Sequence, residues 1–147
     1  MYILVSACLI GLSCRYDSQS KQYAGIDEVC KGYSVLPVCP EQLGGFATPR
    51  LPAERRGKQV VTAAGDDVTV GYVKGAREVL KLALQFGCTT ALLKEKSPSC
   101  GCGKIYDGTF THRVINGDGV TTDLLKEHGI VVWGETQWQE LLKQIKN

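Results

Sequence analysis

Four short runs of aliphatic and β-branched residues, without alternating polar positions, divide the chain. They cover residues 2–5, 35–38, 90–93 and 130–133. Runs of this kind are typical of parallel strands that are covered on both faces. The pattern therefore predicts a small, mostly parallel sheet buried between two outer layers.

Helical periodicity marks three further segments. Residues 70–86 carry apolar side chains at helical spacing, with Thr69 as the predicted cap and Gly87 as the stop. Residues 122–128, closed by Gly129, and residues 136–146, with Trp138 on the inner face, predict two more helices. Strands that alternate with helices indicate the α/β class, and we expect one three-layer, Rossmann-like domain over residues 1–147.

The polar segments predict one extra hairpin and three long loops. Residues 58–63 and 67–69, joined around Gly65-Asp66, read as a surface hairpin. Residues 13–24, 42–56 and 101–119 are rich in Gly, Ser, Asp and Pro, and each stretch follows a predicted strand end. Loops of this length in a small domain are usually functional.

Composition narrows the class of partner. The 147 residues are 44% hydrophobic and carry a net charge of +2, from 17 basic and 15 acidic residues. This balance leaves no extended basic face, so nucleic acid is not expected as the main partner, whereas a small anionic or heteroaromatic ligand fits. The apolar residues 1–12 lack a basic leader and are too short to span a bilayer. We therefore expect a cytoplasmic protein without a membrane partner.

Seven cysteines are present, an odd number that does not suit a secreted disulfide scaffold. Three of them, Cys8, Cys39 and Cys100, come just after predicted strands. The carboxyl ends of parallel strands meet at one edge of a sheet, where ligands bind. We therefore expect the three thiols to converge on a metal or iron–sulfur centre, although Cys8 taken alone resembles an ordinary buried thiol.

The densest motif is Ser97-Pro98-Ser99-Cys100-Gly101-Cys102-Gly103. Glycines beside the thiols let the backbone approach a cluster and aim N–H groups at anionic sulfur. The alternative is a flexible turn with incidental cysteines. Cys100 is favoured as the ligand because it lies nearer the strand end, while Cys102 stays open as a ligand, a redox partner or a bystander.

A second motif, Cys39-Pro40-Glu41-Gln42-Leu43-Gly44-Gly45, places a carboxyl group two residues after a thiol. A partly desolvated carboxyl group beside a metal centre can hold a proton near neutral pH, as a general acid or base requires. The structural alternative is that Glu41 caps the segment that follows it.

The other cysteines and the histidines carry less signal. Cys14 lies in a loop near the proposed edge, Cys30 lies in a short predicted helix, and Cys88 lies at the opposite end of a strand, where a structural role is expected. Neither His112 nor His128 has metal-ligand spacing from a cysteine pair, and no C-x-x-C motif occurs. A zinc ribbon or a thioredoxin-like centre is therefore poorly supported.

Three polar segments supply cations and aromatic rings that suit a nucleobase-like ligand at the mouth of the site. Each can equally be a solvated part of a loop. The segments are Arg15-Tyr16-Asp17, Pro49-Arg50 and Lys104-Ile105-Tyr106-Asp107-Gly108.

With these motifs assembled, the chain resembles the bacterial domain of unknown function 523 family, whose characterised representative is a thiouracil desulfidase. The matching segments span nearly the whole chain. They are Ser6-Ala7-Cys8-Leu9-Ile10-Gly11 with Cys14-Arg15-Tyr16-Asp17, the Cys39-Pro40-Glu41 motif with Pro49-Arg50, Gly65-Asp66-Asp67-Val68-Thr69, and residues 93–101 through Ile105-Tyr106-Asp107-Gly108.

The resemblance implies an oxygen-sensitive [4Fe-4S] cluster held by three cysteines, which map to Cys8, Cys39 and Cys100, and a fourth iron without a protein ligand. It also implies that Glu41 acts in proton transfer and that a serine of the motif, Ser97 or Ser99, orients the substrate. We favour Ser99 because it adjoins the cysteine.

The expected activity is the non-redox, hydrolytic removal of sulfur from a thiolated nucleobase or a similar thiocarbonyl heterocycle. An iron with an open position is a Lewis acid for soft sulfur, and Glu41 can activate the water. The alternative is a cysteine-rich metal-binding or redox-sensing module without catalysis.

Overall fold

The computed structural model describes residues 1–20 and 22–146. Lys21, in the predicted loop 13–24, and Asn147 lie outside the described residues. A four-stranded sheet with the order β2-β1-β5-β8 forms the centre, and all of its neighbouring strands are parallel. Its strands are β1 (Tyr2–Ser6), β2 (Ser34–Val38), β5 (Thr90–Leu93) and β8 (Val131–Gly134). The four predicted strands are thus confirmed, with ends that differ by at most one residue.

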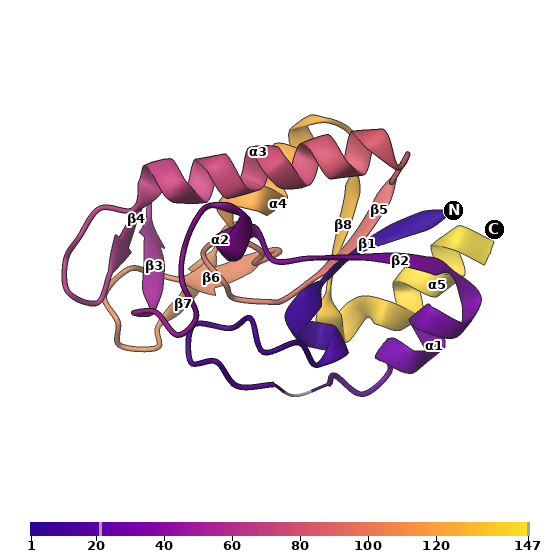
Figure 1. Cartoon of the computed structure of the whole chain (residues 1–147), viewed down its shortest axis with the longest axis horizontal. Helices are drawn as coiled ribbons and strands as arrows, with labels where there is room; N and C mark the ends of the chain where they lie inside the picture. Colours follow the sequence, from indigo (N-terminus) through magenta and orange to yellow (C-terminus); the bar gives the residue numbers. More distant parts are fainter. Residues whose placement is uncertain (21, 147) are drawn as a thin grey trace.

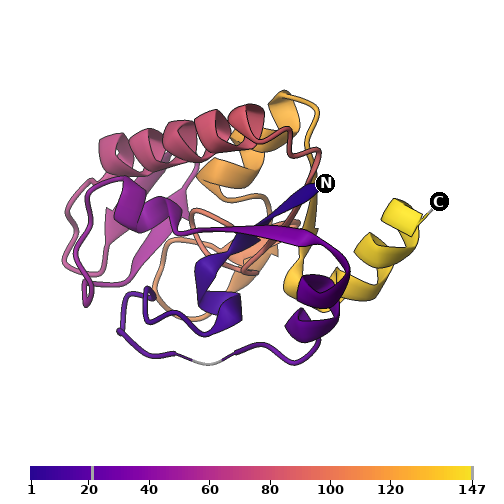
Figure 2. The same ribbon diagram turned by 45° about the vertical axis from the view of Figure 1, so that its right-hand side comes forward.

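Helices cover both faces of this sheet (Figures 1 and 2). One face carries α3 (Thr69–Gln85) and α4 (Val120–Glu127), and the other carries α1 (Ile26–Gly32) and α5 (Trp138–Lys146), which follows the short η2 (Glu135–Gln137). The predicted three-layer α/β fold is therefore confirmed. No helix among the described residues is long and apolar enough to cross a membrane.

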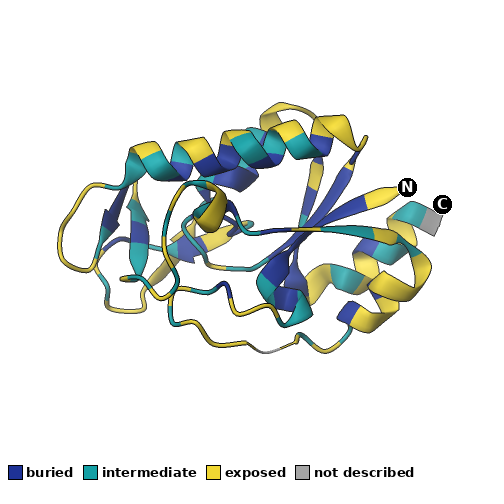
Figure 3. Ribbon diagram, viewed as in Figure 1, coloured by how far each residue is buried: buried dark blue, intermediate teal, exposed yellow. Residues whose placement is uncertain are grey.

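The strands alternate their side chains between two hydrophobic cores because successive residues of a strand face opposite sides. Leu4 and Leu93 pack under α3 and α4, whereas Val5 and Leu92 pack against α1 and α5. Figure 3 shows the buried strands at the centre and exposed residues on the outer helix surfaces. A sheet buried on both faces explains why its strands lack polar alternation.

The predicted extra hairpin exists, but its pairing differs from the prediction. Strand β3 (Ala53–Arg56) pairs antiparallel with β4 (Gln59–Thr62), so the chain turns at 57–58 and not at 65–66. Asp67 contributes only an isolated bridge to Val61. A second hairpin, β6 (Lys104–Tyr106) with β7 (Val114–Asn116), lies inside the predicted loop 101–119.

The predicted cap of α3 is wrong, because Thr69 is the first helical residue and Val68 precedes it. The Thr69 hydroxyl instead donates to Asp67 Oδ1 at 2.6 Å and accepts from the backbone N–H of Val60 at 2.9 Å. Thr69 therefore links the helix to the β3–β4 hairpin.

Candidate functional site

A cavity of about 560 Å³ lies at the carboxyl edge of the sheet. Its walls include residues from the ends of β1, β2 and β5 and from the loop between β6 and β7. Cys8, in the 3-10 turn η1 (Ala7–Ile10), lines it together with Cys39 and Cys100. The three thiols expected to converge thus share one cavity, as strand ends at a single edge allow.

Cys39 immediately precedes the short helix α2 (Pro40–Leu43). Its thiol donates to the carbonyl oxygen of Cys14 at 3.7 Å, and Cys14, which is only 6% exposed, also lines the cavity. Hydrogen bonding with the Cys14 thiol, followed by burial, raises the pKa of Cys39. Cys14, which the sequence placed in a loop near the edge, is therefore a fourth thiol in the cavity wall.

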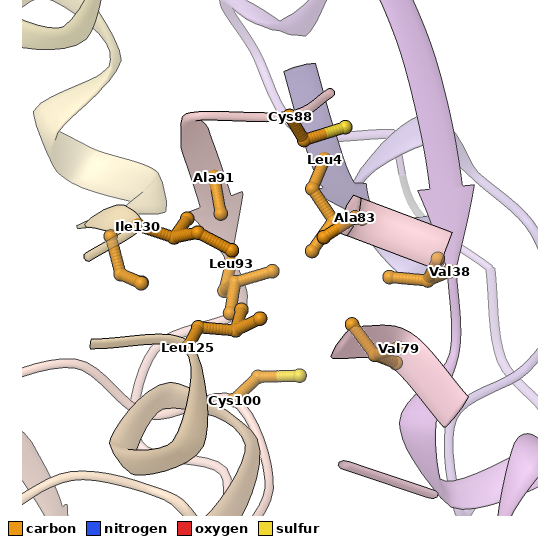
Figure 4. Packing of buried hydrophobic residues seen from close by; sticks show 11 residues of the cluster. Leu4, Val38, Val79, Ala83, Cys88, Ala91, Leu93, Cys100, Leu125 and Ile130 are labelled. Carbon is orange, nitrogen blue, oxygen red and sulfur yellow. The ribbon is translucent and has the colours of Figure 1, made fainter. Parts of the chain in front are cut away.

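Cys100 is buried in a turn after β5, at one end of the packed cluster beneath α3 and α4. In Figure 4 it lies at the opposite end of this cluster from Cys88. Burial raises the pKa of Cys100 to about 12, and a hydrogen bond from Ser6 partly opposes the rise. Ser6 also accepts from the Lys94 N–H at 2.9 Å, which fixes the end of β1 beside the end of β5.

Glu41 lies in the first turn of α2, but its carboxylate accepts hydrogen bonds from side chains and not from the backbone of that helix. Its Oε1 accepts from the Tyr72 hydroxyl at 2.6 Å and from Arg50 Nε at 3.2 Å. No hydrogen bond between described residues involves Glu41 Oε2. The carboxylate is therefore fixed through Oε1, while Oε2 is free of hydrogen bonds from the described residues. Glu41 also lines the cavity.

Arg50 connects three segments of the cavity wall, and its side chain is only 9% exposed. Besides Glu41, its guanidinium donates to Cys14 O at 2.8 Å, to Ala47 O at 3.1 Å and to Thr48 Oγ1 at 2.8 Å. Charge-assisted bonds of this kind are stronger than neutral ones, so Arg50 fixes the loop after η1 against α2.

The two candidate serines lie in different environments. Ser97 lines the cavity, and its hydroxyl oxygen accepts from the N–H groups of Ser99 at 3.1 Å and Cys100 at 3.0 Å. Both bonds use lone pairs of the Ser97 hydroxyl oxygen, so the hydroxyl proton remains available to donate to a ligand. Ser99 is 1% exposed and bonds Thr121 Oγ1 at 2.8 Å, at the start of α4.

The other cysteines do not line the cavity. Cys102 donates to Val132 O at 3.3 Å, Cys88 packs in the core, and Cys30 is exposed on α1. All seven cysteines lie within the described residues as free thiols.

The residues around the cavity fit an iron–sulfur cluster in their donor chemistry. Thiolates are the ligands of such clusters, and metal binding displaces the protons that the buried thiols otherwise keep. Across residues 1–20 and 22–146, no three Cys, His, Asp or Glu side chains group closely enough to hold a single metal ion. A cubane cluster binds each thiolate to a different iron, so its ligands stand farther apart than those of one ion.

Sequence reasoning missed Tyr72 as a site residue. Tyr72 lies on the buried face of α3 and is 3% exposed, and burial together with the neighbouring Glu41 charge raises the pKa of its hydroxyl. The sequence does contain a signal for it: Tyr72 is a polar-tipped ring on an otherwise apolar helix face, and a buried Tyr hydroxyl usually has a hydrogen-bonding partner.

Four of the residues proposed at the mouth of the site do line the cavity. They are Arg15, Tyr16, Arg50 and Tyr106.

Three comparisons relate the chain to known proteins. The model of the 2-thiouracil desulfurase family matches residues 3–137. The uncharacterized protein YbbK of Bacillus subtilis (strain 168) is 42% identical over 150 residues, which span 95% of this chain and 99% of YbbK. A solved structure described as the [4Fe-4S]-dependent thiouracil desulfidase TudS (DUF523Vcz) has a TM-score of 0.93 and 48% identity, and the match covers 99% of this chain and 97% of that one. The chain therefore belongs to the 2-thiouracil desulfurase family.

Proposed function

We propose that the protein is an iron–sulfur-dependent desulfidase that hydrolyses the C=S bond of a thiolated nucleobase or a similar heterocycle. Family membership and the similarity to TudS support this class of activity. The observation that carries the proposal is the common cavity, where Cys8, Cys39 and Cys100 from distant segments share the walls with Glu41.

Cys8, Cys39 and Cys100 would hold a [4Fe-4S] cluster and leave one iron without a protein ligand. That open iron supplies a Lewis acid for a soft thiocarbonyl sulfur, which makes the attached carbon more susceptible to water. In the overall reaction the C=S bond breaks, a C=O bond forms from water, and sulfide leaves with the protons. No net electron transfer is needed.

Glu41 is proposed to move the proton. Its Oε2 accepts a proton from the attacking water and returns it to the departing group, which is general acid–base catalysis. Tyr72 and Arg50, which both bind Oε1, hold the carboxylate in one orientation. They act as positioning residues because neither needs to touch the substrate.

The serine that orients the substrate is proposed to be Ser97 and not Ser99. Ser97 lines the cavity with a hydroxyl proton to donate, whereas the Ser99 hydroxyl is paired with Thr121 outside the cavity. A hydroxyl donor suits a ring nitrogen or an exocyclic oxygen.

Anaerobic reconstitution tests the cluster and the activity separately. We expect about four irons per chain, the content of a cubane cluster, and sulfide release from 2-thiouracil. Alanine at any one of the three ligand cysteines should abolish iron uptake. Cys30→Ala and Cys88→Ala are matched controls that should keep it, since Cys30 is exposed and Cys88 packs only in the core.

The same experiment separates the alternatives. Bound zinc with no iron would indicate a metal-binding module, and a full iron content without sulfide release would indicate a redox-sensing module. Loss of iron in a well-folded Cys88→Ala variant would contradict the ligand assignment.

A further inference from the structure

The loop between β6 and β7 holds aromatic residues in a disfavoured backbone conformation at the cavity. Among the described residues, four non-glycine residues have left-handed φ values: Ser18, Lys96, Phe110 and His112. Three of them, all except Ser18, line the cavity. Phe110 has φ +60° and His112 has φ +63°, a region that bulky side chains rarely adopt. Such strain persists only where surrounding structure imposes it, and it is often associated with function.

A buried carboxylate from another part of the chain holds this loop in place. Glu54, on β3, is only 8% exposed, and its Oε1 accepts from the N–H groups of Gly108 at 2.9 Å and Phe110 at 3.1 Å. Arg56 Nε donates to Gly108 O at 2.7 Å on the same segment. The loop is therefore fixed to the β3–β4 hairpin, which is more than fifty residues away in sequence.

The loop brings several aromatic rings to the cavity wall. Tyr106 and His112 pack edge to face with ring centroids 5.9 Å apart and an interplanar angle of 78°. Phe110 and Tyr16 line the same cavity, and Phe110 is partly exposed within it. Aromatic faces held in this way stack well on planar heterocycles.

We propose that Phe110, with His112 beside it, forms the platform on which the substrate ring stacks, and that Glu54 is the residue that positions this platform. The inference rests on the proposed function, and it narrows the substrate to planar unsaturated heterocycles that present a ring face. The cysteine and glutamate side of the cavity then acts on the sulfur, while the loop side recognises the ring.

Two measurements on Phe110→Ala test the platform. The first is the kcat and KM for sulfide release from 2-thiouracil by the reconstituted protein. The second is the Kd for uracil, which keeps the ring but lacks the sulfur, by titration calorimetry. We expect KM and Kd to rise roughly 5- to 100-fold, the usual effect of losing one base-stacking ring, with kcat and iron content close to those of the parent.

The controls separate a lost ring face from general damage. Phe110→Tyr keeps the ring and should restore both constants. Phe86→Ala removes a ring that is 43% exposed and packs on Tyr2, outside the cavity, and it should change neither constant. Unchanged KM and Kd in Phe110→Ala, or a loss confined to kcat, would overturn the platform.

Glu54 is tested by a pair of variants. Glu54→Ala removes the acceptor for the two loop N–H groups and should raise the uracil Kd in the same direction as Phe110→Ala. Glu54→Gln retains a carbonyl acceptor and should preserve parent-like binding. If Glu54→Ala folds and binds uracil as the parent does, Glu54 does not position the loop.

Failure of the inference is distinguishable from failure of the proposed function. A parent protein that binds uracil but releases no sulfide contradicts the proposed function alone, and the uracil titrations still decide the platform. A parent protein that binds no uracil overturns the platform, whether or not sulfide is released.

Discussion

Replacing Gly75 with alanine should displace the proposed acid–base residue without touching it. Helix α3 packs directly on α2 at this position. A Cβ built on Gly75 would lie 1.9 Å from the carbonyl oxygen of Pro40 and 3.2 Å from the backbone nitrogen of Gly44. Both contacts are to backbone atoms, so no side-chain rotation relieves them.

The magnitude follows from this overlap. Ordinary van der Waals contact begins at 3.4 Å, so the two helices must separate by about 1.5 Å. Overpacking of a well-packed interior costs about 1–3 kcal/mol, and we take the upper end because the clash is between two backbones. Alanine offsets about 1 kcal/mol of this loss in the free energy of unfolding, because its helix propensity is higher than that of glycine. The net loss is about 2 kcal/mol, or a fall in Tm of roughly 4–8 °C for a chain of this size.

Activity should fall further than stability. Pro40 and Glu41 move together, so the 2.6 Å bond between Glu41 Oε1 and the Tyr72 hydroxyl exceeds hydrogen-bonding distance. A misplacement of about 1 Å can cost roughly 10²-fold in rate. We therefore expect kcat for sulfide release, normalised to the iron content, to drop by about that factor.

Thermal unfolding and anaerobic turnover of Gly75→Ala provide the assay, with Gly32→Ala as the matched control. Gly32 is also a helical glycine, on α1, but a Cβ added there would meet no neighbouring atom within 4 Å. Gly32→Ala should be neutral or slightly stabilising, since only helix propensity acts there. A Gly75→Ala protein as stable and as active as the parent would refute the reasoning.

Three further outcomes are expected. Glu41→Gln should assemble the cluster normally but slow sulfide release by roughly 10²–10⁴-fold, the usual contribution of general acid–base catalysis; turnover at the parent rate would remove Glu41 from proton transfer. Ser97→Ala should raise KM for 2-thiouracil, whereas Ser99→Ala should reduce thermal stability and leave KM unchanged; the reverse pattern would favour Ser99. Hydrogen bonds from Thr69 lower the pKa of Asp67, so its stabilising effect is present above its ordinary pKa and is lost as pH falls through the lowered value. Asp67→Ala should therefore destabilise the protein more at about pH 6 than at about pH 3, as urea unfolding would show.

The sheet was predictable because each buried strand carries its own signal. Residues 90–93 form a run of β-branched and aliphatic residues, Thr-Ala-Leu-Leu, and β5 is buried at every position. Runs joined by helices favour parallel pairing, which places the carboxyl ends of the strands at one edge of the sheet. The predicted convergence of the three strand-end cysteines follows from the same rule.

The hairpin could not be placed from the sequence because its register depends on distant contacts. Strand β3 contains Glu54, whose charge argues against a buried strand position. Its carboxylate is buried only because it binds Gly108 and Phe110, which lie over fifty residues later. Tyr72 was missed for the same reason, since its partner Glu41 is 31 residues away and on another helix.

The hydrogen bonds of Arg50 do not depend on the cysteine thiols. Its donors reach Cys14 O, Ala47 O, Thr48 Oγ1 and Glu41 Oε1, and none of these acceptors is a sulfur atom. The loop after η1 is therefore fixed to α2 through backbone and carboxylate oxygens. A ligand thiol replaced by alanine removes a metal ligand but leaves these bonds in place, so the cavity wall should persist. Loss of iron in such a variant then reports on ligation, and retained uracil binding in the same variant would show that the wall is intact.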